Sequence, residues 1–62
     1  MGINLIEYVN QQKIEEAKRL LRESTLKLYE ISDMLGFNNS FYFSRVFKKV
    51  TGMTPKDYRN KT

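Results

Sequence analysis

The chain has 62 residues, a net charge of +4, no cysteine and no histidine. A chain this short forms one small domain, which we expect to be only marginally stable without disulfides. The absence of thiol and imidazole groups removes the common metal ligands and the common nucleophile–base pairs of enzymes. We therefore expect a protein that is not an enzyme and that has neither a metal site nor a cofactor.

Neither a membrane-spanning segment nor a signal peptide is visible in the sequence. The longest uncharged stretch, residues 34–44, is about half as long as the ~18–20 apolar residues that cross a bilayer. These features predict a cytoplasmic protein without a membrane partner.

Positive charge concentrates at the C-terminal end of the chain. Residues 40–62 contain six basic residues and one acidic residue, whereas residues 23–39 contain one basic residue and three acidic residues. A polyanion is therefore expected to bind the C-terminal part. A solvated, lysine-rich tail is the alternative, and charge alone would favour it.

The first helix is expected at residues 4–22. Asn4 can cap its N-terminus, and Glu7 can complete a capping box. Apolar side chains recur on one side at helical spacing. They are Ile6, Val9, Ile14, Ala17, Leu20 and Leu21.

The second helix is expected at residues 27–35, with Ser24 or Thr25 as its cap. Its buried stripe is expected to consist of Leu28, Ile31 and Leu35, with Ser32 as a small residue where two helices approach closely. Gly36 follows, and we expect it to end the helix in the left-handed conformation.

The third helix is expected at residues 40–51, after a turn that contains Asn38 and Asn39. Its sequence divides into two faces at 100° per residue. The apolar face contains Phe43, Val46, Phe47 and Val50, and with Phe37 it is expected to enter the core. The opposite face contains Phe41, Ser44, Arg45, Lys48 and Lys49.

Gly52 is expected to close this third helix, and a last helix is expected at residues 54–60. Thr54 can cap it, Pro55 suits its first position, and Asp57 can complete a second capping box. The second and third helices, joined by a Gly turn and with the later one basic, have the pattern of a helix-turn-helix.

A short pattern occurs twice, fifty residues apart, at residues 2–8 and 52–58. Both copies read Gly, an apolar residue, a capping residue, two variable positions, an acidic residue and Tyr. The simplest account is a tandem repeat of helix-turn-helix units, of which this chain contains the second. Chance is the alternative, because these residue types are common.

Four longer motifs cover most of residues 2–59. They are I-x-x-A-x-x-L-L at 14–21, I-S-x-x-x-G-F at 31–37, Y-F-S-R-x-F-K-K-x-x-G at 42–52, and T-P-x-x-Y-R at 54–59. In these motifs the chain resembles the AraC/XylS family of bacterial transcription regulators. Ser32 stands where that family usually has Ala, a change that fits the same space.

The resemblance implies an all-α, homeodomain-like helix-turn-helix fold, with a long linker helix at 4–22 followed by three shorter helices. The ranges are 27–35 for the first motif helix, 40–51 for the recognition helix and 54–60 for the C-terminal helix, all in one domain over 1–62. The chain corresponds to the second half of the family's DNA-binding region, so the first helix-turn-helix is missing.

The partner that the resemblance implies is double-stranded DNA, bound in service of transcription control. It also implies a parent protein with a sensing domain, and it allows RNA polymerase as a partner of that parent. The missing upstream helix-turn-helix is a further expected partner, and Ile6, Val9, Leu20 and Leu21 are expected to be partly exposed without it.

Direct base reading is expected from the middle of the third helix, which would enter the major groove. Arg45 is the best candidate for a bidentate contact to guanine, and a phosphate contact is the alternative. Ser44 can contact a base or a phosphate. Phe41 on a polar face has two explanations, namely contact with a thymine methyl group or packing against the missing half.

Phosphate contacts are expected from Lys48, Lys49 and Arg59, which would hold the register on DNA without reading sequence. Ser40 lies at the N-terminal end of the third helix, which in this motif points deepest into the groove. Asn39 is expected to form the turn, since Asn tolerates turn geometry, but it is retained among the DNA-binding candidates.

Two other functions compete with double-stranded DNA binding. One is a helical protein-interaction module, in which the apolar side of the linker helix binds a partner and the charges only confer solubility. The other is single-stranded nucleic acid binding through stacking on Phe41 and Tyr42. The latter usually requires aromatics displayed on a sheet or in a groove, which this sequence does not predict.

Overall fold

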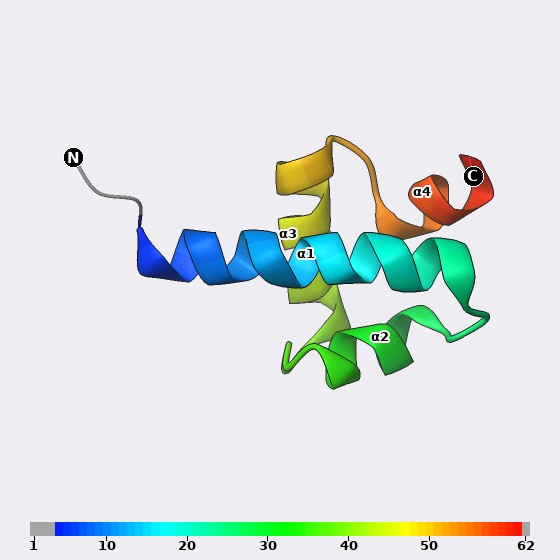
Figure 1. Cartoon of the computed structure of the whole chain (residues 1–62), viewed down its shortest axis with the longest axis horizontal. Helices are drawn as coiled ribbons and strands as arrows, with labels where there is room; N and C mark the ends of the chain where they lie inside the picture. The colour runs from blue at the N-terminus through cyan, green and yellow to red at the C-terminus, as the bar shows by residue number, and fades with distance from the viewer. Residues whose placement is uncertain (1–3, 62) are drawn as a thin grey trace.

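The computed structural model describes residues 4–61, and this part of the chain is entirely helical. The helices are α1 (Leu5–Glu23), α2 (Leu28–Met34), α3 (Ser40–Thr51) and α4 (Pro55–Lys61). The long helix α1 crosses in front of α3 in Figure 1, with α2 and α4 on opposite sides of its C-terminal half. The expected all-α fold is therefore confirmed.

Helix boundaries follow the capping chemistry. The helices α1 and α4 begin directly after Asn4 and Thr54, the residues expected to cap them, which lie just outside the helices. Asn4 Oδ1 accepts hydrogen bonds from the backbone N–H groups of Ile6 and Glu7, at 2.8 and 3.3 Å. These bonds satisfy two of the N–H groups that a helix start leaves without a partner.

The prediction that Ser24 or Thr25 caps the second helix is wrong. The N-cap of α2 is Lys27, whose backbone N–H donates to Glu30 Oε1 at 2.8 Å. Ser24 is instead the C-cap of α1, and its hydroxyl donates to the carbonyl oxygen of Leu20 at 2.7 Å. The four residues between α1 and α2 leave room for both caps.

Two glycines end helices in the left-handed region, as expected. Gly36 has φ +85° and follows α2, and Gly52 has φ +87° and is the C-cap of α3. A side chain at either position would be strained in this conformation.

The core forms where α1, α2 and α3 meet. Its buried residues are Ile14, Ala17, Leu20, Leu21, Ile31, Phe37, Phe43 and Phe47. The rings of Phe37, Phe43 and Phe47 follow one another at centroid distances of 5.3 and 6.0 Å, and the ring of Tyr58 lies 5.5 Å from Phe47. This row of aromatic rings connects the turn before α3 to α4, and Ser32 is buried beside it as expected.

The N-terminal half of α1 extends beyond the other helices (Figure 1). Leu5 and Ile6 are 78% and 68% exposed, and Tyr8 and Val9 are about half exposed. The expectation of partial exposure is confirmed for Ile6 and Val9 and is wrong for Leu20 and Leu21, which are buried. The boundary between exposed and buried apolar residues falls within α1, because only the C-terminal half of this helix faces α2 and α4.

The two copies of the short repeat begin their helices in the same way. Asn4 caps α1 and Thr54 caps α4, since Thr54 Oγ1 accepts from the backbone N–H of Asp57 at 3.1 Å. Residues 2 and 3 of the first copy lie outside the described residues. The copies differ at their last position, because Tyr58 packs on Phe47 whereas Tyr8 is half exposed.

Candidate nucleic-acid interface

The start of α3 is held by a single side chain. Asn39 Oδ1 accepts hydrogen bonds from the backbone N–H groups of Phe41 and Tyr42, at 2.7 and 3.2 Å. This cap uses the side-chain oxygen of Asn39 and does not use its side-chain NH2 group, which can still donate a hydrogen bond. Ser40, the first residue of α3, is exposed beside it.

The helix α3 has one face in the core and one face in solvent. Phe43 and Phe47 are fully buried, and they hold the helix in a fixed rotation about its axis. We call the opposite side the outer face of α3, and its residues are Phe41, Ser44, Arg45, Lys48 and Lys49. Ser44 is half-buried and the other four are exposed. The expected division of this helix is therefore confirmed except at Val50, which was expected in the core but is exposed because it lies at the groove beside α1.

The outer face is positively charged without compensation. The sequence of α3 contains no Asp or Glu, and within residues 4–61 Arg45, Lys48 and Lys49 form no ion pair. The two lysines lie in the last turn of α3, where the helix dipole favours positive charge. An anionic partner could therefore approach this helix without displacing a carboxylate.

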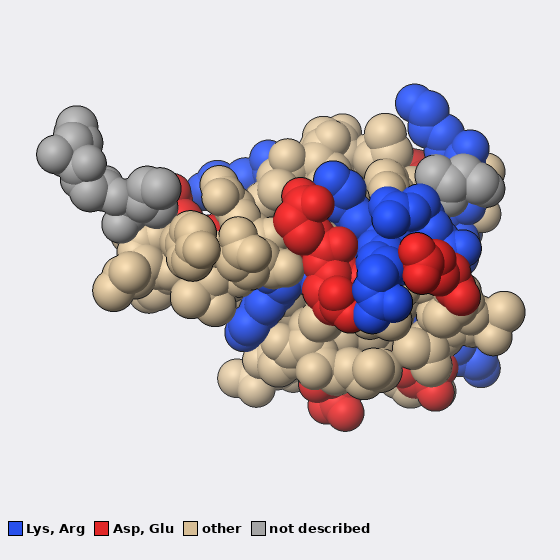
Figure 2. All heavy atoms as spheres, viewed as in Figure 1, with Lys and Arg blue, Asp and Glu red and all other residues tan. Residues whose placement is uncertain are grey.

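Charges on α1 are arranged differently. Figure 2 shows acidic and basic side chains side by side over the C-terminal half of α1. Arg19 hydrogen-bonds Glu16 and lies 3.5 Å from Glu23, and Lys18 lies 3.3 Å from Glu15. The hydrogen bond from Arg19 lowers the pKa of Glu16. These charges compensate one another, so this face attracts a polyanion less than the outer face of α3 does.

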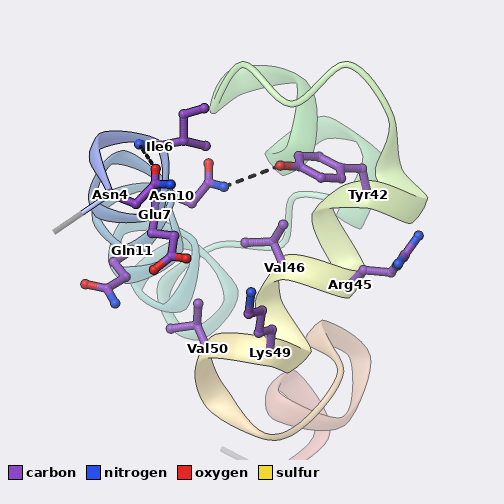
Figure 3. Close-up of a pocket in the computed structure, with 10 residues that line it drawn as sticks. All are labelled: Asn4, Ile6, Glu7, Asn10, Gln11, Tyr42, Arg45, Val46, Lys49 and Val50. Carbon is purple, nitrogen blue, oxygen red and sulfur yellow. Dashed lines mark hydrogen bonds between the residues drawn. The ribbon is translucent and has the colours of Figure 1, made fainter.

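A groove runs between the N-terminal half of α1 and α3 (Figure 3). Arg45, Val46 and Lys49 are among its α3 residues, and Arg45 extends away from α1. Asn10 Nδ2 donates to the hydroxyl of Tyr42 at 3.4 Å across the groove. This bond couples α1 to the first turn of α3, and no sequence motif predicted it.

Arg59 is the one predicted DNA-binding residue that does not lie with the others. Its Nε and Nη2 donate to the carbonyl oxygens of Leu21 and Ser24, both at 3.2 Å. The side chain is half-buried, and it satisfies carbonyl groups that the C-terminus of α1 leaves without partners. A phosphate contact by Arg59 stays a prediction, and it would have to compete with these two bonds.

Two further contacts were not expected from the sequence. Arg22 Nη1 donates to the hydroxyl of Tyr58 at 2.9 Å, which ties α1 to α4. Lys13 Nζ lies 5.2 Å from the centre of the Phe37 ring, a distance that permits a cation–π interaction. Both join residues at least 24 positions apart, so no local pattern could indicate them.

Among residues 4–61 no group of three or more His, Cys, Asp or Glu side chains could hold a metal ion. In this part of the chain no helix has the length and apolar character needed to cross a membrane.

Comparisons with known proteins agree with this geometry. A family model described as a helix-turn-helix domain matches residues 1–61. The C-terminal domain of the two-component response regulator yesN from Fusobacterium nucleatum has a similar solved structure, with a TM-score of 0.89 and 44% identity. That match covers 95% of this chain and 57% of the other.

Curated relatives are transcription regulators and not enzymes. The chain is 42% identical over 60 residues to the transcriptional activator RhaR of Yersinia pseudotuberculosis, and 37% identical over 59 residues to the arabinose operon regulatory protein of Escherichia coli. These matches cover 97% and 95% of this chain but 21% and 20% of the relatives, so the chain spans about a fifth of their length. The family match, these relatives and the solved structure together show that the chain belongs to the AraC-type helix-turn-helix family of DNA-binding transcription regulators.

Proposed function

We propose that this chain binds double-stranded DNA sequence-specifically, with α3 as the recognition helix in the major groove. The observation that carries the proposal is the outer face of α3, which is exposed, contains three basic residues and has no acidic residue. The major groove admits one helix and presents a distinct set of donors and acceptors for each base pair. The buried Phe43 and Phe47 would hold this face toward the bases.

Arg45 is the residue that we assign to base reading. It lies in the middle of α3, and its guanidinium extends away from α1 into solvent (Figure 3). An arginine in this position can donate two parallel hydrogen bonds to O6 and N7 of guanine. Ser44 precedes it and is close enough to the same surface to contact a base or a phosphate.

Phosphate contacts are assigned to Lys48 and Lys49, one turn further along α3. Ser40 and Asn39 lie at the N-terminal end of the contact surface. The side-chain NH2 group of Asn39 can donate to a phosphate while its side-chain oxygen caps α3. Contacts of this kind set the register of the helix on DNA and add salt dependence to the affinity.

The exposed apolar side of α1 supports a partner within the same protein. Leu5, Ile6, Tyr8 and Val9 are each about half exposed or more, and residues 4–8 continue a pattern whose second copy packs into this domain through Tyr58. A preceding helix-turn-helix unit would cover these side chains. A complete regulator of this kind would act in the bacterial cytoplasm and could contact RNA polymerase through its other parts.

The same exposed side chains favour a second candidate function, a protein-interaction module in which α1 binds a separate partner and α3 does not touch DNA. The two proposals differ in their dependence on Arg45, because Arg45 lies on α3 and not on the apolar side of α1. Loss of the Arg45 side chain would weaken DNA binding and leave binding of a protein through α1 unchanged.

Fluorescence anisotropy of a labelled mixed-sequence duplex, at two salt concentrations, tests the first proposal. We expect salt-sensitive binding that Arg45→Ala weakens. Arg19→Ala is the matched control, since it removes the same charge from the compensated surface of α1. Equal losses for both variants would indicate a general charge effect, and binding that neither salt nor Arg45→Ala changes would contradict the proposal.

A further inference from the structure

Phe41 is an exposed aromatic residue at the N-terminal end of α3. The residue is 81% exposed, the most of any large apolar residue that the structure describes. Within residues 4–61 its ring has no aromatic or cationic partner. The backbone N–H of Phe41 donates to the Asn39 side chain that caps α3. The backbone of Phe41 is therefore held in place, while its ring is exposed to solvent.

The position of Phe41 on the helix distinguishes it from the exposed apolar residues of α1. The α3 side of the groove beside α1 consists of Tyr42, Arg45, Val46, Lys49 and Val50, and Phe41 is not among the residues that line it. A unit packed on the N-terminal half of α1 would meet that groove first. Phe41 instead lies on the side of α3 opposite the core, together with Arg45 and Lys48.

Phe41 and Arg45 are four residues apart, so they are neighbours on one side of α3. Four residues advance a helix by about 6 Å, and successive base pairs are about 3.4 Å apart. Two side chains with this spacing can therefore reach bases that lie within about two base pairs of each other. The positive charge of Arg45, Lys48 and Lys49 around the ring is suited to DNA and unsuited to an apolar protein surface.

We propose that Phe41 contacts the methyl group of a thymine in the major groove, within about two base pairs of the guanine that Arg45 reads. The C5-methyl of thymine is the one apolar group that a base edge presents there, and an apolar side chain is its natural partner. Phe41 would then be a specificity-determining residue, and the preferred sites of this chain would share a thymine close to a guanine. This inference rests on the proposed function.

Uracil tests the contact directly, because it differs from thymine only by lacking the methyl group. The chain first selects its preferred sequences from a pool of randomised duplexes. Each thymine of the selected site is then replaced in turn by uracil, and the affinity is measured by anisotropy. We expect one replacement to weaken binding by about fourfold, the effect of losing one buried methyl group.

Variants connect this effect to the residue. Phe41→Ala should bind the thymine and uracil duplexes equally, and Phe41→Leu, which keeps an apolar side chain, should still distinguish them. Met34→Ala removes an exposed apolar side chain from α2 and should preserve the full difference. Circular dichroism verifies that each variant is helical.

The outcomes separate this inference from the proposed function. If the chain selects a site with an Arg45-dependent guanine but no thymine is sensitive to uracil, the role of Phe41 is overturned and DNA recognition stands. Sensitivity that persists in Phe41→Ala overturns it as well. If the chain selects no preferred sequence, the proposed function and this inference both fail.

Discussion

Asn39 stands where the turn after Gly36 becomes α3, and one oxygen atom of its side chain accepts two backbone hydrogen bonds. At this position the same residue serves the fold and borders the proposed DNA contact. Its neighbour Asn38 is exposed and lies outside the cap. The pair therefore permits a comparison in which only one of two adjacent, identical side chains is structural.

Asn39→Ala should lower the free energy of unfolding by about 1 kcal/mol, because two N–H groups at the start of α3 lose their acceptor. Asn39→Asp should retain most of the stability, since a carboxylate also accepts these bonds. Asn38→Ala is the control and should change the stability by less than about 0.5 kcal/mol. Urea unfolding monitored by circular dichroism measures all three, and equal effects at both positions would contradict the role of the cap.

Arg59 shows how a basic residue can be structural within a basic segment. Its guanidinium lies against the C-terminus of α1, with hydrogen bonds to two carbonyl oxygens. Lys61, two residues later in the same helix, is exposed. The two residues contribute the same charge but differ in their contacts.

We expect Arg59→Ala to destabilise the chain by about 1–3 kcal/mol, because two carbonyl groups lose a charged donor. Lys61→Ala should be nearly neutral for stability. If Arg59 also contacts phosphate, its replacement should reduce the salt dependence of DNA binding more than the loss of Lys61 does. Stability that is unaffected by Arg59→Ala would show that the hydrogen bonds to α1 contribute little.

At the scale of the element, α3 combines a buried aromatic face with a basic outer face. The two faces have different roles. Phe43 and Phe47 fix the rotation of the helix about its own axis, and the outer face places positive charge at the surface. Gly52 then ends the helix at φ +87°, a backbone conformation that favours glycine. The length of α3, and with it the position of Lys48 and Lys49 in the last turn, depends on that ending.

Lys48→Ala should reduce the dependence of DNA affinity on salt by about one unit of logarithmic slope, as one phosphate contact is lost. The preference among sequences should stay the same, because phosphates carry no base information. Lys27→Ala, at the exposed N-cap of α2, is the matched control. An altered sequence preference in Lys48→Ala would mean that this lysine reaches a base edge.

At the scale of the whole molecule, only the C-terminal half of α1 contributes residues to the core. Leu20 and Leu21 are buried against the rest of the chain, whereas Leu5 and Ile6 extend beyond it (Figure 1). One helix thus provides both part of a core and an exposed apolar surface. The exposed surface contributes little to the stability of this chain until something covers it.

Leu21→Ala should lower the free energy of unfolding by about 2–5 kcal/mol, because it removes a buried side chain from the core. In a domain this small, that loss should leave much of the chain unfolded. Leu5→Ala, the same substitution on the same helix, should change the stability by less than about 0.5 kcal/mol. Thermal unfolding distinguishes these outcomes. In a longer protein that includes a preceding unit, Leu5→Ala should become clearly destabilising, and an unchanged small effect there would argue against such a unit.

The sequence alone determined the elements of this protein and the division of α3 into two faces, because both depend on residues within a few positions of one another. Asn4, Asn39 and Thr54 act on the next two or three backbone N–H groups, and Gly36 and Gly52 act on their own dihedral angles. The core of Phe37, Phe43 and Phe47 likewise followed from helical spacing and the turn. The cap of α2 was misassigned, since Ser24 suits the end of one helix as well as the start of the next.

The tertiary structure decided what each long side chain does, because those contacts join residues far apart in the chain. It assigned Arg59 to the carbonyls of α1, joined Asn10 to Tyr42, and buried Leu20 and Leu21 while leaving Leu5 and Ile6 exposed. None of these contacts can be predicted from the spacing of residues. The sequence pattern around a basic or apolar residue is the same whether or not another helix packs against it. Which charges remain for DNA is therefore a property of how the four helices pack.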